Sequence, residues 1–458
     1  MTRESKMAGN KVDDRPLTFE DILNWFEAGN KPKDQWRVGA EHEKFVFRLQ
    51  GHETVAYDGP AGIKALLEGM MRFGWSGVYE GQTLIALERG KANISLEPGG
   101  QFELSGAPLS TMHEICDETR DHLTEAKTVA AELGLGFLGL GFTPDWRRDQ
   151  IPVMPKGRYK IMREYMPKVG QLGLDMMFRT CTVQANLDFA SEADMVAKFR
   201  TSLALQPIAT ALFANSPFVE GKPSGFLSTR ANIWTDTDAD RTGMLDFVFR
   251  DGFGFETYAN YLLDVPMYFA KREGQFVDLS GRSFREFMAG TLADMPGDRA
   301  SLKDFADHAT TAFPEVRLKQ YLEMRGADSA PLGRLCALPA LWTGIFYDSA
   351  ALAAAWDLCK AWPLEDHERL RADVARLGLK AQIAGRSVQD IAIDMVAIAR
   401  SGLKARARLN GAMLDESIYL DELEAIALSG ITPAEHLLTL YHGPWQGQVS
   451  PAYEAVAY

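Results

Sequence analysis

Four separated stretches of the chain alternate polar and apolar side chains inside otherwise apolar runs. They span residues 37–47, 94–105, 179–189 and 321–328. Successive side chains of a β-strand point to opposite faces of a sheet, so each stretch predicts a strand with one polar face. The pattern is typical of antiparallel sheets and restricts the chain to folds that contain one.

Carboxylates occupy several of these polar positions. Glu41 and Glu43 share one face of the first predicted strand, and His42 lies on the opposite face, where a packing role is expected. In the second stretch Gln101 and Glu103 are in phase, while Glu97 is offset by a Pro-Gly-Gly turn or bulge. Acids that lie side by side repel one another and lose hydration, so such a face is unfavourable unless a cation neutralises it.

Two interpretations of the acidic positions remain open. Each acid could be a solvated residue on the outer face of an antiparallel strand. The fourth stretch, however, pairs Glu323 with Arg325 at the same period, and four such stretches together favour a metal-lined concave face. Mg²⁺ takes oxygen ligands and is usually shared with substrate phosphates, which indicates nucleotide chemistry.

The same stretches carry a family resemblance. Together with motifs at 154–159, 214–218, 233–238 and 264–268, they resemble the plant-type glutamate-cysteine ligases, a class shared by plants and bacteria. The resemblance runs from about residue 15 to the C-terminus. It implies an α+β fold like that of glutamine synthetase, in which an antiparallel sheet curls into a half-barrel with helices on its convex side.

The resemblance also implies an activity. Such a ligase uses ATP to convert the side-chain carboxylate of glutamate to an acyl phosphate, which the cysteine amine attacks to give γ-glutamylcysteine, ADP and phosphate. This reaction is the first step of glutathione biosynthesis. The expected small-molecule partners are glutamate, cysteine and ATP as co-substrate, with two or more Mg²⁺ ions, for which Mn²⁺ could substitute.

Alternation and resemblance together assign the site. The expected metal-holding residues are Glu41, Glu43, Glu97, Glu103, Gln184 and Glu323. Arg325 would contact the transferring phosphoryl group, and Glu103 would also act in catalysis. The resemblance assigns Arg158 and Arg230 to an amino-acid carboxylate and Tyr268 to the cysteine pocket, although a surface ion pair is the ordinary role of an isolated arginine.

The four cysteines form no Cys-x-x-Cys pair and no zinc-like spacing with histidine. Their ordinary role in a reducing compartment is that of free, mostly buried thiols. The resemblance complicates this expectation, because Cys116 and Cys336 stand where the plant enzymes carry a regulatory disulfide.

Composition limits partners and location. A formal net charge of −13 without a sustained Lys/Arg run argues against nucleic-acid and anionic-membrane partners. Residues 1–15 are polar and lack the apolar centre of a signal peptide, and no later run is long enough to span a membrane. These features predict a disordered tail and a cytoplasmic protein. They do not separate a monomer from a homodimer, and either is expected.

The absence of a Ser/Gly-rich or Pro-rich linker predicts a single catalytic domain over 16–458, with a sheet core at about 35–330 and a helical layer at about 331–458. Apolar residues at helical spacing predict helices at 18–26, 60–73, 110–133, 191–214, 338–356, 364–377, 387–409 and 415–428. A Gly-x-Gly-x-x-Gly string at 134–139 follows a helix and leads into a strand, so it is not a dinucleotide loop.

Three alternatives to the glutamate-cysteine ligase stay open. The same set of metal-holding acids, an acidic cage, could activate glutamate for an amine other than cysteine. It could instead serve a metal-dependent hydrolase, which would form product without ATP. A regulator that binds metal or nucleotide without turnover is the third.

Overall fold

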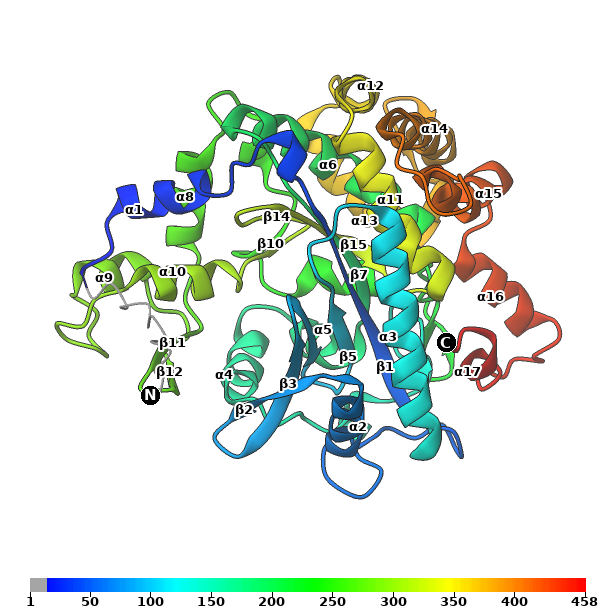
Figure 1. Cartoon of the computed structure of the whole chain (residues 1–458), viewed down its shortest axis with the longest axis horizontal. Coiled ribbons are helices and arrows are strands. Elements are labelled where there is room, and N and C mark those ends of the chain that lie inside the picture. The colour runs from blue at the N-terminus through cyan, green and yellow to red at the C-terminus, as the bar shows by residue number, and fades with distance from the viewer. Residues whose placement is uncertain (1–14) are drawn as a thin grey trace, which may run out of the picture.

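The computed structural model describes residues 15–458, and an antiparallel sheet of nine strands forms the centre of this part of the chain (Figure 1). The strand order is β14-β15-β7-β1-β5-β4-β3-β2, and β6 pairs with the far end of β1. The strands are β1 Val38–Arg48, β2 Ser76–Glu80, β3 Thr83–Arg89, β4 Ala92–Leu96, β5 Phe102–Ser105, β6 Leu135–Leu138, β7 Thr182–Leu187, β14 Val316–Leu318 and β15 Leu322–Asp328. The predicted α+β fold with an antiparallel sheet is confirmed.

Three long helices cover the apolar face of this sheet. They are α3 (Met112–Glu132), α6 (Glu192–Leu212) and α11 (Leu332–Phe346), which pack on β1, β6, β7 and β15. Val38 and Ala40 of β1 point into this layer and are buried, because they alternate with the polar residues of the strand. His42 is buried on the same side, as its position opposite Glu41 and Glu43 predicts.

Of the remaining helices, α8 to α10 lie on one flank of the molecule and α14 to α17 on the other (Figure 1). They are α1 Phe19–Glu27, α2 Ile63–Met70, α4 Gly157–Tyr165, α5 Gly173–Arg179, α7 Thr229–Ile233, α8 Phe255–Asp264, α9 Phe284–Ala289, α10 Leu302–Ala309, α12 Ser349–Cys359, α13 Leu364–Leu377, α14 Val388–Arg406, α15 Asp421–Ser429, α16 Pro433–His442 and α17 Ala452–Ala455. Two-stranded pairings join β8 Phe218–Val219 to β9 Lys222–Pro223, β10 Thr242–Gly243 to β13 Phe313–Pro314, β11 Phe269–Arg272 to β12 Gln275–Asp278, and β16 Gln382–Ile383 to β17 Arg386–Ser387.

Local signals place several helix starts where the sequence predicts them. The hydroxyl of Thr18 accepts the N–H of Asp21, whose carboxylate in turn accepts the N–H of Thr18, so a capping box begins α1. Ser191 caps α6 through the N–H of Asp194. The predicted helix at 364–377 coincides with α13. The string at 134–139 forms β6, as its position after a helix indicates.

Two predicted elements differ from those observed. The strand expected from residue 179 begins at Thr182, because Arg179 ends α5 and turns into the protein to donate to the carbonyl of Trp146. The single helix expected at 338–356 is two helices, since the Asp348 carboxylate accepts the N–H of Ala351 and caps a new helix, α12.

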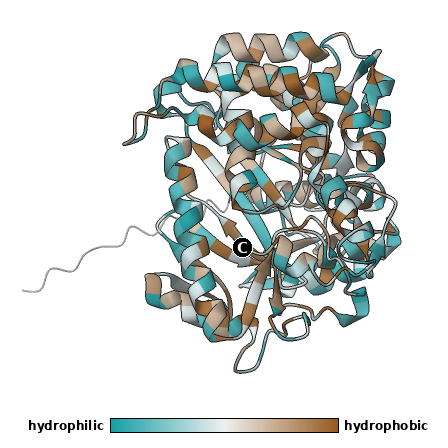
Figure 2. Cartoon of the chain, turned by 90° about the vertical axis from the view of Figure 1, so that its right-hand side faces the viewer, coloured by the Kyte–Doolittle hydropathy of each residue, from teal (hydrophilic) through white to brown (hydrophobic). Residues whose placement is uncertain are grey.

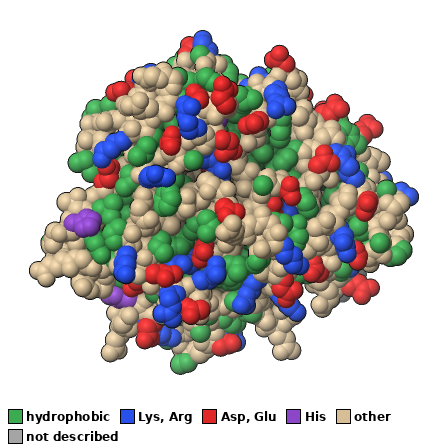
Figure 3. Space-filling model, turned by 180° about the vertical axis from the view of Figure 1, so that it is seen from behind, with side chains coloured by type: hydrophobic (Ala, Val, Ile, Leu, Met, Phe, Trp, Pro, Cys, Tyr) green, Lys and Arg blue, Asp and Glu red, His purple; other side chains and the backbone are tan. Residues whose placement is uncertain are grey.

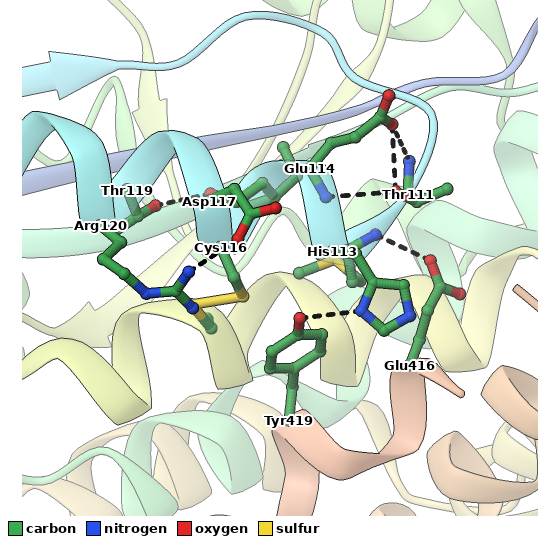
Figure 4. Close-up of a disulfide and its surroundings, with 12 residues drawn as sticks. Thr111, His113, Glu114, Cys116, Asp117, Thr119, Arg120, Glu416 and Tyr419 are labelled. Atoms are coloured by element: carbon green, nitrogen blue, oxygen red, sulfur yellow. Dashed lines mark hydrogen bonds and ion pairs between the residues drawn. A yellow bond between two sulfur atoms is a disulfide. The ribbon is translucent and has the colours of Figure 1, made fainter. Parts of the chain in front are cut away.

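A disulfide joins Cys116 of α3 to Cys336 of α11, with the two Cα atoms 5.6 Å apart (Figure 4). The bond therefore links two of the helices that cover the sheet. Cys181 and Cys359 are buried free thiols, as their spacing predicts. A regulatory role for the disulfide stays a prediction.

The outer faces carry mixed side chains. Figure 2 shows hydrophobic and hydrophilic residues along the same helices on the C-terminal side, and Figure 3 shows acidic and basic groups interspersed over the rear face. Of the helices in residues 15–458, none alone has the length and apolar character of a membrane span; α11 and α12 reach it only jointly, across a 96° bend. The disordered tail predicted for 1–15 lies outside the described residues except for Arg15.

Candidate active site

A cavity lies on the polar face of the sheet, opposite the layer of α3, α6 and α11. Strands β1, β5, β7 and β15 form its floor, and α4, α5 and α7 form part of its wall. The predicted site residues that line it are Glu41, Glu43, Glu97, Glu103, Arg158, Gln184, Arg230 and Arg325. Side chains from residues 41 to 325 therefore meet in one place.

The strand register puts two of the acids directly side by side. Glu43 of β1 pairs with Glu103 of β5, and Glu41 pairs with Gln184 of β7. Burial, Glu103 and Glu97 raise the pKa of Glu43 well above its usual range. Burial and Glu97 likewise raise the pKa of Glu103, whose carboxylate accepts a hydrogen bond from Ser95 at 2.9 Å. The carboxyl groups of the cavity floor therefore hold their protons more strongly than free carboxyl groups do.

Glu41 has a similar environment. Its Oε1 accepts the side-chain N–H of Asn186 at 2.7 Å. Burial, followed by the charges of Glu323 and Glu103, raises the pKa of Glu41 to about 7. A bound cation would favour loss of this proton, because it would attract the carboxylate that burial and the neighbouring acids disfavour.

The turn that carries Glu97 is held against α4. Lys156, at the start of α4, donates through Nζ to the carbonyl of Leu96 at 2.8 Å, and the hydroxyl of Tyr159 donates to the same carbonyl. These bonds place Glu97 near Arg158 on the first turn of α4, across the cavity from β1.

Glu323 occupies a different position from the other predicted acids. It is fully buried beside the cavity, and its two oxygens accept hydrogen bonds from Arg317 at 2.8 Å each, while Oε1 also accepts one from Arg325 at 2.7 Å. Burial opposes its ionisation, but Arg317, Lys319 and Arg325 hold its pKa well below the usual range. Glu323 is therefore an ionised anchor for arginines in this structure.

Arg325 connects that anchor to the floor of the cavity. Its Nη1 donates to Gln184 Oε1 and to Glu323 Oε1, both at 2.7 Å. The backbone carbonyl of Arg325 accepts Nη2 of Arg230 at 2.9 Å. The two guanidinium groups thus approach the cavity from one side and face the unneutralised acids on the other.

Tyr268 lies outside the cavity lining. Its ring is buried under the guanidinium of Arg241, 3.9 Å from the ring centre, and its hydroxyl has no hydrogen-bond partner within residues 15–458. The next residue, Phe269, lines the cavity instead. The cysteine-pocket role of Tyr268 stays a prediction.

Several cavity residues were missed by the sequence analysis. They are Thr182, Trp234, Thr310, Thr311, Phe313, Arg317 and three methionines, Met162, Met176 and Met177. The sequence did carry a signal for Arg317, because Arg317 and Lys319 are two residues apart just before the predicted strand at 321–328. In an extended chain this spacing puts both side chains on one face. The aromatic and methionine positions come from helices and loops whose orientation depends on packing.

Comparisons with known proteins agree with this arrangement. The model of Glutamate-cysteine ligase family 2 matches residues 37–455. The chain belongs to this ligase family. It is 54% identical over 448 residues to the chloroplastic glutamate-cysteine ligase of Medicago truncatula, which covers 98% of this chain and 86% of the relative. The chloroplastic enzyme of Arabidopsis thaliana is also 54% identical, over 98% of this chain and 84% of the relative.

A solved structure supports the fold of this ligase. The glutamate-cysteine ligase of Francisella tularensis in complex with AMP superposes with a TM-score of 0.55 at 12% identity, over 89% of this chain and 85% of that one. The family model and the plant relatives confirm the predicted family and ligase class, and this structure confirms the predicted fold.

The relatives contradict one prediction. They are named chloroplastic enzymes, so the cytoplasmic location inferred for this ligase is wrong. The inference failed because the lack of an apolar signal region bears on secretion alone, and it does not separate cytoplasm from plastid.

The side chains of this ligase fit a hard divalent cation. Glu41, Glu43, Glu97 and Glu103 supply only oxygen ligands, the type that Mg²⁺ and Mn²⁺ prefer. Among residues 15–458, no three carboxylate, imidazole or thiol groups already surround one point as metal ligands. A bound cation would offset the burial and the neighbouring acids that raise the pKa values of Glu41, Glu43 and Glu103.

Proposed function

We propose that this chain joins the side-chain carboxylate of glutamate to the amine of cysteine at the expense of ATP, with Mg²⁺ held by the glutamates of the cavity. The observation that carries this proposal is that the cavity has an acidic floor and arginines at both of its ends. Glu41, Glu43, Glu97 and Glu103 would hold cations, while Arg158, Arg230 and Arg325 would hold anions. The names of the plant relatives and the AMP bound by the Francisella enzyme support the same reaction.

The reaction requires an activated acid, because a carboxylate and an amine do not condense in water. Arg325 is held by Gln184 and Glu323, so it can face the phosphoryl group without reorganising during transfer. Bound Mg²⁺ would supply charge neutralisation at the phosphates and act as a Lewis acid. Fixed charges of this kind lower the barrier most when they are preorganised.

The arginines on the other walls would select the amino acids. Arg230 is fixed through its backbone and through Nη2, which leaves the rest of its guanidinium for a carboxylate. Arg158 lies at the opposite end of the cavity, beside Glu97. The cavity measures about 210 Å³, less than the roughly 300–1,000 Å³ typical of small-molecule sites. We therefore place the reacting groups inside it and the nucleoside beyond its mouth.

The test follows oxygen as well as product. Glutamate labelled with ¹⁸O in its side-chain carboxylate should transfer one label to inorganic phosphate, because the acyl phosphate breaks between carbon and the labelled oxygen. Phosphate release should require glutamate and proceed fastest with cysteine among a panel of amines, with the dipeptide identified by mass. Faster turnover with another amine would keep the mechanism and change the substrate. Product without ATP, or nucleotide binding without turnover, would refute the ligase.

The single catalytic domain over 16–458, the monomeric or dimeric state and the absence of nucleic-acid and membrane partners stay predictions.

A further inference from the structure

A second cavity, of about 420 Å³, lies where α11, α15, α16 and α17 meet. This is the side of the molecule that Figure 2 presents to the viewer. Its walls are mainly apolar and include Leu437, Leu440 and Val456. The described residues that line it are all different from those that line the active-site cavity, so the two are separate sites.

Arg334 of α11 lies in this cavity with an incomplete set of partners. The residue is 6% exposed. Glu422 Oε1 forms an ion pair with Nε at 2.9 Å, but neither Nε nor Nη1 has a hydrogen-bond partner among residues 15–458, and both atoms are buried. The Glu422 side chain is itself 48% exposed, so water weakens its attraction. Leaving a buried cationic donor unbonded is costly, and a second anion in the cavity would remove that cost.

Asn215 supplies an acceptor in the same cavity. Its Nδ2 donates to the carbonyls of Gly139 and Ser329, both at 2.9 Å, and these two bonds fix the orientation of the amide. Oδ1 is consequently held in place, and it is buried without a partner in the described part of the chain. The cavity therefore offers a charged donor, a neutral acceptor and an apolar wall.

We propose that this cavity binds an N-acylated apolar amino acid, the chemistry of a peptide C-terminus. The carboxylate would bind Arg334 at Nη1, and the amide N–H would donate to Asn215 Oδ1. The apolar side chain would pack on Leu437, Leu440 and Val456. A volume of about 420 Å³ lies within the usual range for small-molecule sites.

N-acetyl-L-leucine is the probe, and N-acetyl-L-leucinamide, which lacks the carboxylate, is its matched control. Titration of the full chain, followed by ligand-observed NMR, should give a dissociation constant of about 1 mM for the acid and at least tenfold weaker binding for the amide. Arg334→Met should weaken binding of N-acetyl-L-leucine until its dissociation constant equals that of the amide. Arg386→Met, which removes an exposed arginine paired with Asp394, should leave binding unchanged.

A second variant keeps the test valid if Arg334→Met does not fold. Ile431 is 55% exposed at the mouth of the cavity, so the Ile431→Glu variant should fold. Its new carboxylate should repel that of N-acetyl-L-leucine and weaken binding at least threefold. Saturating glutamate should not displace the probe, which makes the measurement independent of the proposed ligase activity. Equal binding of acid and amide, unchanged binding in a folded Arg334→Met or Ile431→Glu variant, or displacement by glutamate would overturn the proposal.

Discussion

Asp328 and Arg230 are connected through one hydroxyl group: Ser216 donates to Asp328 Oδ2 at 2.7 Å and accepts the backbone N–H of Arg230 at 3.2 Å. Asp328 is fully buried at the end of β15 and also accepts the hydroxyl of Ser228, the residue that caps α7. The last residue of a central strand thus fixes the helix that presents Arg230 to the cavity.

Asp328→Asn should disturb that helix, because an amide NH₂ would face donors where a carboxylate oxygen now accepts. We expect KM for glutamate to rise about tenfold, with a smaller change in kcat, in steady-state assays at saturating ATP and cysteine. Asp348→Asn, the same substitution at the cap of α12, is the control. An unchanged KM, or an equal rise in the control, would contradict a positioning role.

Glu43→Gln and Glu103→Gln should lower kcat by about 10²-fold or more while the melting temperature stays constant or rises. Each removes a charge that the cation needs, but it also removes repulsion between neighbouring strands. The comparison is with Glu88→Gln, an exposed acid of β3 in the same sheet, which should retain full activity. Loss of folding with normal activity per folded molecule would refute the acidic cage.

Arg317→Met should destabilise the fold by about 3 kcal/mol in urea unfolding, because Glu323 would lose two hydrogen bonds and stay buried. Adding Glu323→Leu should recover part of that loss, since the second change removes the uncompensated charge. A double variant less stable than the single one would show that the pair is not coupled in this way.

Oxidation should shift the mobility of the chain on a non-reducing gel, because the Cys116–Cys336 bond closes a loop across a sequence separation of 220 residues. Cys336→Ser should abolish the shift, whereas Cys359→Ser, at a buried free thiol, should not. Reduction of the wild-type chain should also lower the free energy of unfolding by about 3–5 kcal/mol. A shift that persists in Cys336→Ser would exclude this bond as its cause.

Acid should weaken the fold through His308, which is buried, stacks on Phe284 and contacts the carbonyl of Leu262 at 2.8 Å. Burial lowers the pKa of His308 from 6.5 to about 4. As pH falls, the unfolded state therefore takes up this proton before the folded state does. The contribution of neutral His308 to the free energy of unfolding is complete above pH 6.5 and is lost as pH falls toward 4, by up to about 3 kcal/mol.

His308→Gln should flatten the dependence of unfolding free energy on pH across that window. His436→Gln, at an exposed position of α16, is the control and should keep the wild-type slope. Equal slopes of unfolding free energy against pH for wild type and His308→Gln would show that His308 does not cause the acid sensitivity.

Periodicity placed Glu41 and Glu43 on the strand face that lines the cavity. The alternation of Glu41 and Glu43 with His42 predicts both an acidic cavity and a buried histidine, and the β1 register has both. Helix caps at Thr18 and Ser191 were also predictable from local sequence, because each capping hydrogen bond joins residues only three positions apart. The break between α11 and α12 was missed, since apolar composition runs unchanged through both helices.

The sequence by itself indicated four stretches of the central sheet, the polar face of each and the family that the chain resembles, because these follow from residue order and local spacing. Only the tertiary structure decided which acids remain unneutralised. Glu43 and Glu323 have the same alternating pattern, yet Glu43 lies beside Glu103 while Glu323 is held by Arg317 and Arg325. The difference arises from strand register and long-range packing, which bring together charges that lie far apart along the chain.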